Sequence, residues 1–332
     1  MDKEIKGFIE NNSNTNGDCD HCDTKKASLI DCKELQDHFF PLLDIYEIAE
    51  DGVELSKVLD EDWSIFNITA EKITKSLLTS IIDNHEKYQP LIENNVKLVH
   101  HTETEDLIQN WEAFKIELKN ENRFLIKNPA DLELVEEVLP VRSYTKGKIF
   151  YRSRISASSE GHLPTNMGKP PHKLAKAGRA NPQGIPYLYL AQSTKTTLYE
   201  ARATFLDYVT IGEFKLQENI KVITLRTSYQ VSPFLDDFSV EKYVKNKAFI
   251  DLLEAELSKP LRRLDNELDY LPTQYLCEYI KHLGYDGVEY GSSLHEDGIN
   301  LVIFDETKLK CTSTKVHEIS KINIESDVLE PS

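Results

Sequence analysis

Arginine is distributed unevenly along this chain of 332 residues. Arg123 is the first of only nine arginines, and five of the nine fall within one stretch of the second half. Those five are Arg142, Arg152, Arg154, Arg179 and Arg202. Because a guanidinium is a rigid fork that binds phosphate bidentately, its use in place of lysine indicates an anionic ligand such as a pyrophosphate. We assign Arg152 and Arg179 to such a ligand, and the other three to structural salt bridges with the acidic N-terminal half of the chain.

Glu200 stands out in the same stretch. Residues 142–202 hold 11 basic residues and only two carboxylates, Glu160 and Glu200. Glu200 falls in a helix expected over about 195–206, where its alternative role is to stabilise the helix dipole from the first turns. The basic surroundings would keep its carboxylate ionised and direct it toward a cation that develops during a reaction.

A second candidate site lies near the N-terminus. Cys19, Cys22, Cys32 and His38 form the pattern C-x2-C-x9-C-x5-H, which predicts a small tetrahedral zinc site. The alternative is a segment with free thiols, because only the first pair has the spacing typical of a zinc half-site.

Composition and charge exclude several classes of protein. The formal net charge is −17, and residues 1–140 hold 31 Asp and Glu against 14 Lys and Arg, whereas the remainder is balanced. This disfavours general binding to nucleic acid or to an anionic membrane. We find no run of about 18 apolar residues and no signal-peptide pattern. The five cysteines do not form a disulfide framework, so we expect a reduced, cytoplasmic protein.

The helices and strands that must hold these residues divide the chain into two parts. Helical spacing of apolar residues over 68–83 and 104–119, the second preceded by a capping-box pattern of Thr102 and Glu105, predicts a mostly helical domain over 1–140. This acidic half either regulates the basic half or serves folding and oligomerisation.

Short strands and helices alternate after residue 140. We expect strands at 149–155, 187–191, 220–225 and 299–304, and helices at 195–206, 240–258 and 273–283, the last ending before Gly284. Residues 156–186 have no periodicity but run directly into a strand, which favours an ordered binding loop. Residues 311–332 are expected to be a polar tail. The whole is an α+β protein: a mainly helical domain followed by a mixed α/β domain.

Four blocks of the second half resemble the RES domain, named for an Arg, a Glu and a Ser. They are Phe150-Tyr151-Arg152, the run from Gly178 to Ala191, Thr197-Leu198-Tyr199-Glu200, and Tyr290-Gly291-Ser292-Ser293 with the strand that follows. The resemblance covers about residues 148–305, and we expect the domain itself to span 148–310. It implies a fold similar to ADP-ribosyltransferases, a role as a bacterial toxin with an antitoxin protein as partner, and NAD as the substrate.

The resemblance also implies roles for individual residues. Arg152 matches the Arg that holds an NAD phosphate, Glu200 the Glu, and Ser292 the Ser, with Ser293 as the alternative. Tyr189 matches a tyrosine near the nicotinamide, and Arg179 and Asn181 lie in a loop that binds the substrate. This chain has Ala180 where the family commonly has Trp, which affects how that loop packs.

The N-terminal half is similar to a domain that precedes RES in one subgroup and is grouped with HEPN folds. The matching pieces are Cys19-x2-Cys22, residues 41–47 and residues 61–66. HEPN ribonucleases need an Arg-x4–6-His motif, and no histidine follows Arg123 before His162. We therefore do not expect this half to cleave RNA.

Three functions remain open from the sequence. The first is an enzyme that breaks the nicotinamide–ribose bond of NAD, as a phosphorylase or a glycohydrolase. The second is an ADP-ribosyltransferase that modifies a specific protein, and the third is a non-catalytic binding module. The nicotinamide of NAD is already a cationic leaving group, so one carboxylate suffices where ordinary glycosidases need two. The oligomeric state stays open.

Overall fold

The computed structural model describes residues 2–22, 24–66, 71–99, 103–130, 136, 139–226, 232–235, 239–259 and 267–322. The chain forms two compact units, one of Met1–Leu107 with Ser228–Phe249, the other of Ile108–Thr227 with Ile250–Ser332. The predicted domain limit at residue 140 therefore differs from the division between the units. Ile68 of the predicted 68–83 helix and Thr102 of the predicted capping box lie outside the described residues.

The first unit consists mainly of short helices. Its elements are α1 (Lys3–Asn12), β1 (Thr15–Gly17), β2 (Ala27–Leu29), η1 (Cys32–Leu35), α2 (Gln36–Leu43), β3 (Tyr46–Glu54), α3 (Leu55–Trp63), α4 (Glu71–Ile82), α5 (Gln89–Glu93) and β4 (Asn95–Leu98). The apolar stripes of these helices meet in one core that contains Leu42, Leu59, Ile65 and Ile81, each almost fully buried. β1 pairs with β2 and β3 with β4, both antiparallel.

The predicted zinc ligands do not come together in this unit. The ring of His38, on α2, packs against Phe8 with ring centroids 4.3 Å apart, whereas Cys32 Sγ lies 3.8 Å from Nε2 of His21. Burial, and next the charges of Asp31 and Cys19, raises the pKa of the Cys32 thiol. Among the described residues, no three His, Cys, Asp or Glu side chains are grouped to hold a metal ion. The zinc prediction for Cys19, Cys22, Cys32 and His38 is therefore not supported.

The second unit is built around a large sheet. Its elements are β5 (Val141–Tyr144), β6 (Ile149–Ser156), η2 (Pro164–Asn166), η3 (His172–Leu174), β7 (Leu188–Ala191), α8 (Thr194–Glu200), β8 (Tyr208–Leu216), β9 (Ile220–Thr224), η4 (Glu267–Tyr270), α10 (Leu271–His282), β10 (Gly287–Gly291), β11 (Ile299–Ile303), η5 (Glu306–Lys308) and β12 (Leu309–Glu318). The division between the units falls inside α6 (Glu103–Asn120) and α9 (Val240–Ser258).

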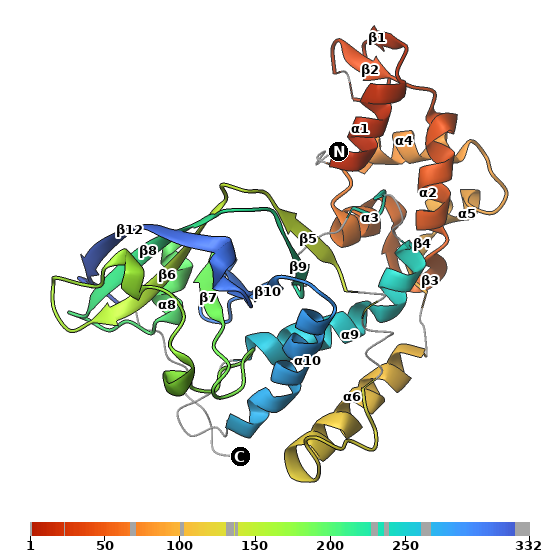
Figure 1. The fold of residues 1–332 in the computed structure, drawn as a ribbon. Helices are drawn as coiled ribbons and strands as arrows, with labels where there is room; N and C mark the ends of the chain where they lie inside the picture. Colours follow the sequence, from red (N-terminus) through yellow and green to blue (C-terminus); the bar gives the residue numbers. More distant parts are fainter. Residues whose placement is uncertain are drawn as a thin grey trace. The chain divides into compact units, whose positions relative to one another are not determined.

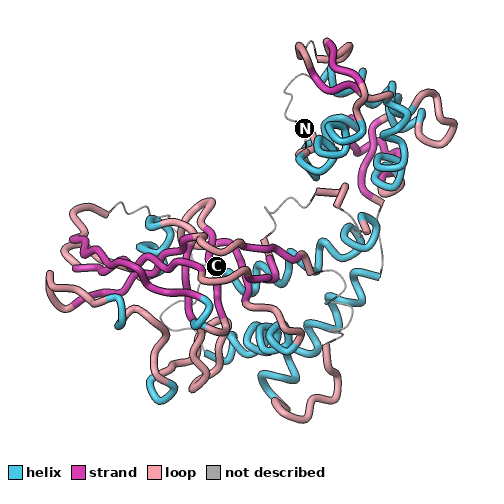
Figure 2. Tube along the Cα trace, turned by 45° about the horizontal axis from the view of Figure 1, so that its top comes forward, coloured by secondary structure: helices cyan, strands magenta, loops and turns pink. Residues whose placement is uncertain are grey.

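The sheet has eight strands in the order β12-β8-β6-β7-β11-β10-β9-β5, and Figure 2 shows these strands side by side. Neighbouring strands are antiparallel except β9 and β10, which are parallel. α8 packs on β6 and β7, and α10 lies beside β10 (Figure 1). Fully buried Phe150, Leu188, Val222 and Leu301 belong to its core. The second unit is therefore a mixed α/β structure.

The strands predicted at 149–155, 187–191, 220–225 and 299–304 are confirmed to within about two residues, and Gly284 follows α10 with a φ of +89° as a helix-ending glycine should. The expectation of a tail from residue 311 was wrong for its first part. Residues up to Glu318 continue β12, which pairs with β8. A strand at the edge of a sheet is held by its backbone and needs few apolar side chains, so the hydropathy pattern did not reveal it.

Candidate active site

Glu200 is the last residue of a short helix. The hydroxyl of Ser193 caps α8 by accepting a hydrogen bond of 3.1 Å from the backbone N–H of Thr196, and the helix ends at Glu200, well before the predicted residue 206. Arg202, two residues on, has a φ of +49° that turns the chain away. A carboxylate at the C-terminal end of a helix is disfavoured by the dipole, so the dipole role considered for Glu200 does not apply.

Two side chains from the sheet hold this carboxylate instead. Ser292 Oγ donates a hydrogen bond of 2.6 Å to Oε1 of Glu200, and Asn300 Nδ2 donates one of 2.7 Å to the same oxygen. Ser292 directly follows β10 and Asn300 lies on β11, whose register pairs Asn300 with Tyr290. Among the described residues, Oε2 of Glu200 has no hydrogen-bond partner. The arrangement orients one carboxylate oxygen and leaves the other for a ligand.

Glu200 lines a small cavity of about 150 Å³. Its other lining residues come from β6, β7, α8 and its C-terminal turn, β10 and β11: Arg152, Ser153, Tyr189, Leu190, Ala191, Thr197, Ala201, Tyr290 and Asn300. Ser153, next to Arg152, accepts a hydrogen bond from Thr197 Oγ1 at 3.1 Å and so connects β6 to α8. The sequence-predicted residues Arg152, Tyr189 and Glu200 therefore meet at one cavity, although they are up to 48 residues apart.

Arg152, on β6, is partly buried. Burial, and next the like charge of Arg154, lowers the pKa of its guanidinium to about 10, while Glu306 opposes this shift. At that pKa the guanidinium stays charged at neutral pH. Its Nη1 atom is buried and makes no hydrogen bond to any residue that the structure describes. A buried, charged donor without a partner is costly, so it indicates a place for an anionic ligand.

The loop with Arg179 and Asn181 is tied firmly to the fold. The Tyr189 hydroxyl donates a hydrogen bond of 2.8 Å to Oδ1 of Asn181 and accepts one of 3.1 Å from the backbone N–H of Ala180. A Cβ on Gly178 would lie 2.7 Å from that hydroxyl and 2.6 Å from the Asn181 oxygen, so a larger residue does not fit there. Asn181 and Tyr189 thus shape the loop. Ala180 is fully buried.

Tyr290 and Asn300 belong to the site, but sequence reasoning gave neither a role. Tyr290 is buried and lines the small cavity. Burial raises the pKa of its phenol; the charge of Arg179 opposes this rise, and that of Glu200 adds to it. Both residues stood in the motif around Ser292, which was the available signal. Ser293 makes no hydrogen bond to Glu200 among the described residues, so the geometry favours Ser292 over the alternative.

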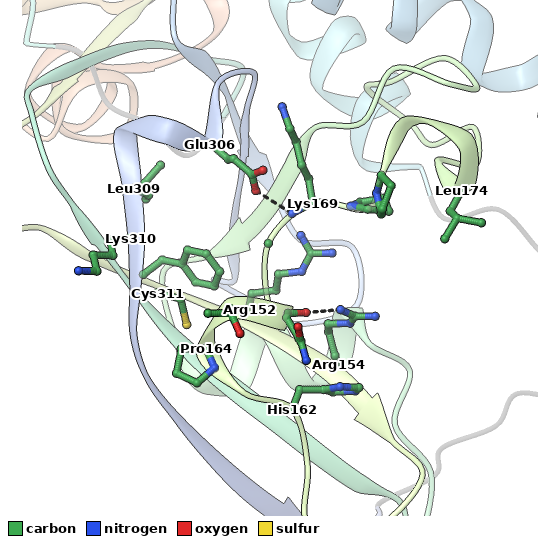
Figure 3. Close-up of a pocket in the computed structure, with 16 residues that line it drawn as sticks. Arg152, Arg154, His162, Pro164, Lys169, Leu174, Glu306, Leu309, Lys310 and Cys311 are labelled. Carbon is green, nitrogen blue, oxygen red and sulfur yellow. Dashed lines mark hydrogen bonds between the residues drawn. The ribbon is translucent and has the colours of Figure 1, made fainter.

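A much larger cavity, of about 1070 Å³, adjoins the small one through Arg152. Figure 3 shows Arg152 and Arg154 pointing into it from β6, beside residues of the loop that includes Pro164 and Lys169. The opposite wall is formed by Glu306, Leu309, Lys310 and Cys311 (Figure 3). The stretch 156–186, predicted to be an ordered binding loop, thus supplies much of the cavity's wall.

These features define a site that combines an oriented carboxylate with a partly buried arginine on a mixed sheet. The family model of the RES domain matches residues 150–323, which is half of the chain. This chain therefore belongs to the RES domain family. The match begins after the first 149 residues, so the similarity of the N-terminal half to HEPN folds stays a prediction.

Comparison with other proteins adds one structure. A chain of the M. tuberculosis MbcT–MbcA toxin–antitoxin complex is 14% identical, with 56% of this chain and 91% of that chain covered, at a TM-score of 0.34. No curated protein matches the chain. None of the helices that the structure describes combines the length and the apolar character needed to cross a bilayer.

Proposed function

We propose that this protein consumes NAD by breaking the bond between nicotinamide and ribose. The observation that carries the proposal is the carboxylate of Glu200, held by Ser292 and Asn300, at the same cavity as Arg152. Membership of the RES family supports the same substrate. The family also supports a role as a bacterial toxin that is neutralised by an antitoxin protein.

The reaction needs little acid–base chemistry. The nicotinamide ring of NAD is a cation and leaves as neutral nicotinamide, so no general acid has to protonate it. Positive charge develops on the ribose as the bond breaks. The carboxylate of Glu200 stabilises that charge, and its Oε2 atom accepts a ribose hydroxyl or orients the nucleophile. Arg152 binds a phosphate of the dinucleotide through its unpartnered Nη1. The rings of Tyr189 and Tyr290 form walls of the small cavity beside the nicotinamide.

Phosphorolysis, hydrolysis and ADP-ribosyl transfer break the same bond and differ only in the acceptor. We propose phosphate or water as the acceptor. The test is mass spectrometry of the whole protein incubated with NAD, with and without inorganic phosphate. Formation of phosphorylated ADP-ribose only with phosphate would establish a phosphorylase, and free ADP-ribose in both samples a glycohydrolase. Intact NAD in both samples would contradict the proposal and favour a transferase or a binding module.

Removing the groups that orient Glu200 should slow the reaction. We expect Ser292→Ala and Asn300→Ala each to lower kcat roughly tenfold, because each loses one hydrogen bond to a charged oxygen. The Ser293→Ala variant is the matched control and should keep the wild-type kcat. The measurement is the initial rate of nicotinamide release at saturating NAD. A Ser293→Ala loss as large as that of Ser292→Ala would contradict the assignment.

A further inference from the structure

The large cavity carries more positive charge than one phosphate contact requires. Arg152 and Arg154 are two residues apart on β6, so both side chains leave the same face of the strand. Both line the cavity together with Lys169 and Lys310, and the one carboxylate among its lining residues is Glu306. Two guanidinium groups on one face repel each other unless an anion lies between them.

The two guanidinium groups use only some of their hydrogen-bond donors within the protein. Arg154 donates from Nη1 to the backbone carbonyl of Asn166, and no carboxylate among the described residues forms a salt bridge with it. Glu306 Oε2 is engaged by the backbone N–H of Lys169 at 2.8 Å. Nη1 of Arg152 is buried without a partner in the described part of the chain. The structural salt bridge expected for Arg154 is therefore absent there, and both guanidiniums keep donors for a ligand.

We propose that Arg152 and Arg154 together bind a diphosphate, and that the large cavity holds the adenosine diphosphate half of the substrate. This inference rests on the proposed function, because it places the nicotinamide ribose at Glu200 and the rest of the dinucleotide beyond Arg152. Arg154 then becomes a second substrate-binding arginine, and its contact with Asn166 holds η2 against the ligand.

The shape and lining of the cavity fit this half of the molecule. Arg152 belongs to both cavities, so a ligand that extends from one to the other must pass its guanidinium. Two forks on one strand can each bind one phosphate of a diphosphate. Apolar walls from Pro164, Pro171 and Leu174 offer contact to a base and ribose. The volume of about 1070 Å³ leaves room for them.

A truncated substrate tests the assignment. Nicotinamide mononucleotide has the same scissile bond as NAD but lacks the adenylate half. We expect Arg154→Ala to raise the KM for NAD roughly ten- to a hundredfold, since a charged hydrogen bond to phosphate is lost. Cleavage of the mononucleotide should keep its kcat/KM, because Arg154 contacts the phosphate of the adenylate half, which the mononucleotide lacks. Arg154→Lys should fall between, and Arg123→Ala, an exposed arginine outside the cavity, should match the wild type.

Direct binding separates this inference from the proposed function. Titration calorimetry of the whole protein with ADP should show binding that weakens by the same factor in Arg154→Ala, with an unchanged melting temperature. An equal loss with NAD and the mononucleotide, or ADP affinity that Arg154→Ala leaves unaltered, would overturn the inference. If the protein binds ADP through Arg154 but never cleaves NAD, the cavity assignment stands and the proposed function fails. If the mononucleotide is not cleaved at all, the ADP titration alone decides.

Discussion

Glu200→Gln is expected to lower the rate of NAD cleavage about a thousandfold while the protein stays folded. The amide has the shape of the carboxylate and its oxygen can still accept hydrogen bonds from Ser292 and Asn300. It carries no negative charge, however, and the positive charge that develops on the ribose then loses its stabilising partner. Electrostatic groups aimed at developing charge are worth about two to three orders of magnitude in kcat. The measurement is kcat for nicotinamide release, with the melting temperature recorded alongside.

Glu160→Gln is the matched control for this change. Glu160 is the other carboxylate of the basic stretch 142–202, it is exposed, and it lines neither cavity. Its variant removes the same charge from the same stretch and should keep the wild-type kcat. If Glu160→Gln lost as much activity as Glu200→Gln, the effect would come from the net charge and not from a carboxylate at the reacting bond. A fully active Glu200→Gln would exclude Glu200 from the chemistry.

The sequence identified Glu200 as a candidate but did not predict how it is held. Its place among basic residues singled it out, and the resemblance supplied a role. The end of α8 could not be predicted, because the apolar pattern continues past Glu200 while the backbone turns at Arg202. The partner Asn300 depends on the register between β10 and β11, which is a long-range property of the sheet. Sequence reasoning therefore found the acid and the serine but not the second donor.

The spacing of residues in the sequence did not predict which side chains meet, because the fold determines their contacts. The first Cys pair near the N-terminus has the spacing of a zinc half-site, but α2 directs the predicted ligand His38 onto the ring of Phe8. Arg154 is a second such case. The sequence predicted a salt bridge for it, but no carboxylate among the described residues forms one. Arg142 does form a structural salt bridge, but its partner does not come from the acidic half: its Nη1 lies 2.8 Å from Oε1 of Glu289, on β10.

Glu289 is the centre of a buried polar network next to the site. It lies on β10 with no exposed surface, and its carboxylate accepts hydrogen bonds from Arg142 at 2.8 Å, Gln192 at 3.0 Å, Thr224 at 3.3 Å, and the Tyr144 hydroxyl. Arg226 lies 3.5 Å from the same carboxylate. A buried carboxylate with this many donors is stable only while all of them are present.

Glu289→Ala is therefore expected to lower the free energy of unfolding by about 3–5 kcal/mol, because it removes the buried carboxylate that both arginines contact. Glu218→Ala, which breaks an exposed contact of 3.3 Å with Lys308, is the control and should cost about 1 kcal/mol or less. Chemical denaturation monitored by circular dichroism measures both. Tyr290 follows Glu289 on β10, Ser292 directly follows that strand, and Gln192 precedes the cap of α8, so the loss of the network should also displace the groups around Glu200. An unfolding free energy within 1 kcal/mol of the wild type, together with full activity, would show that β10 and α8 are positioned without this carboxylate.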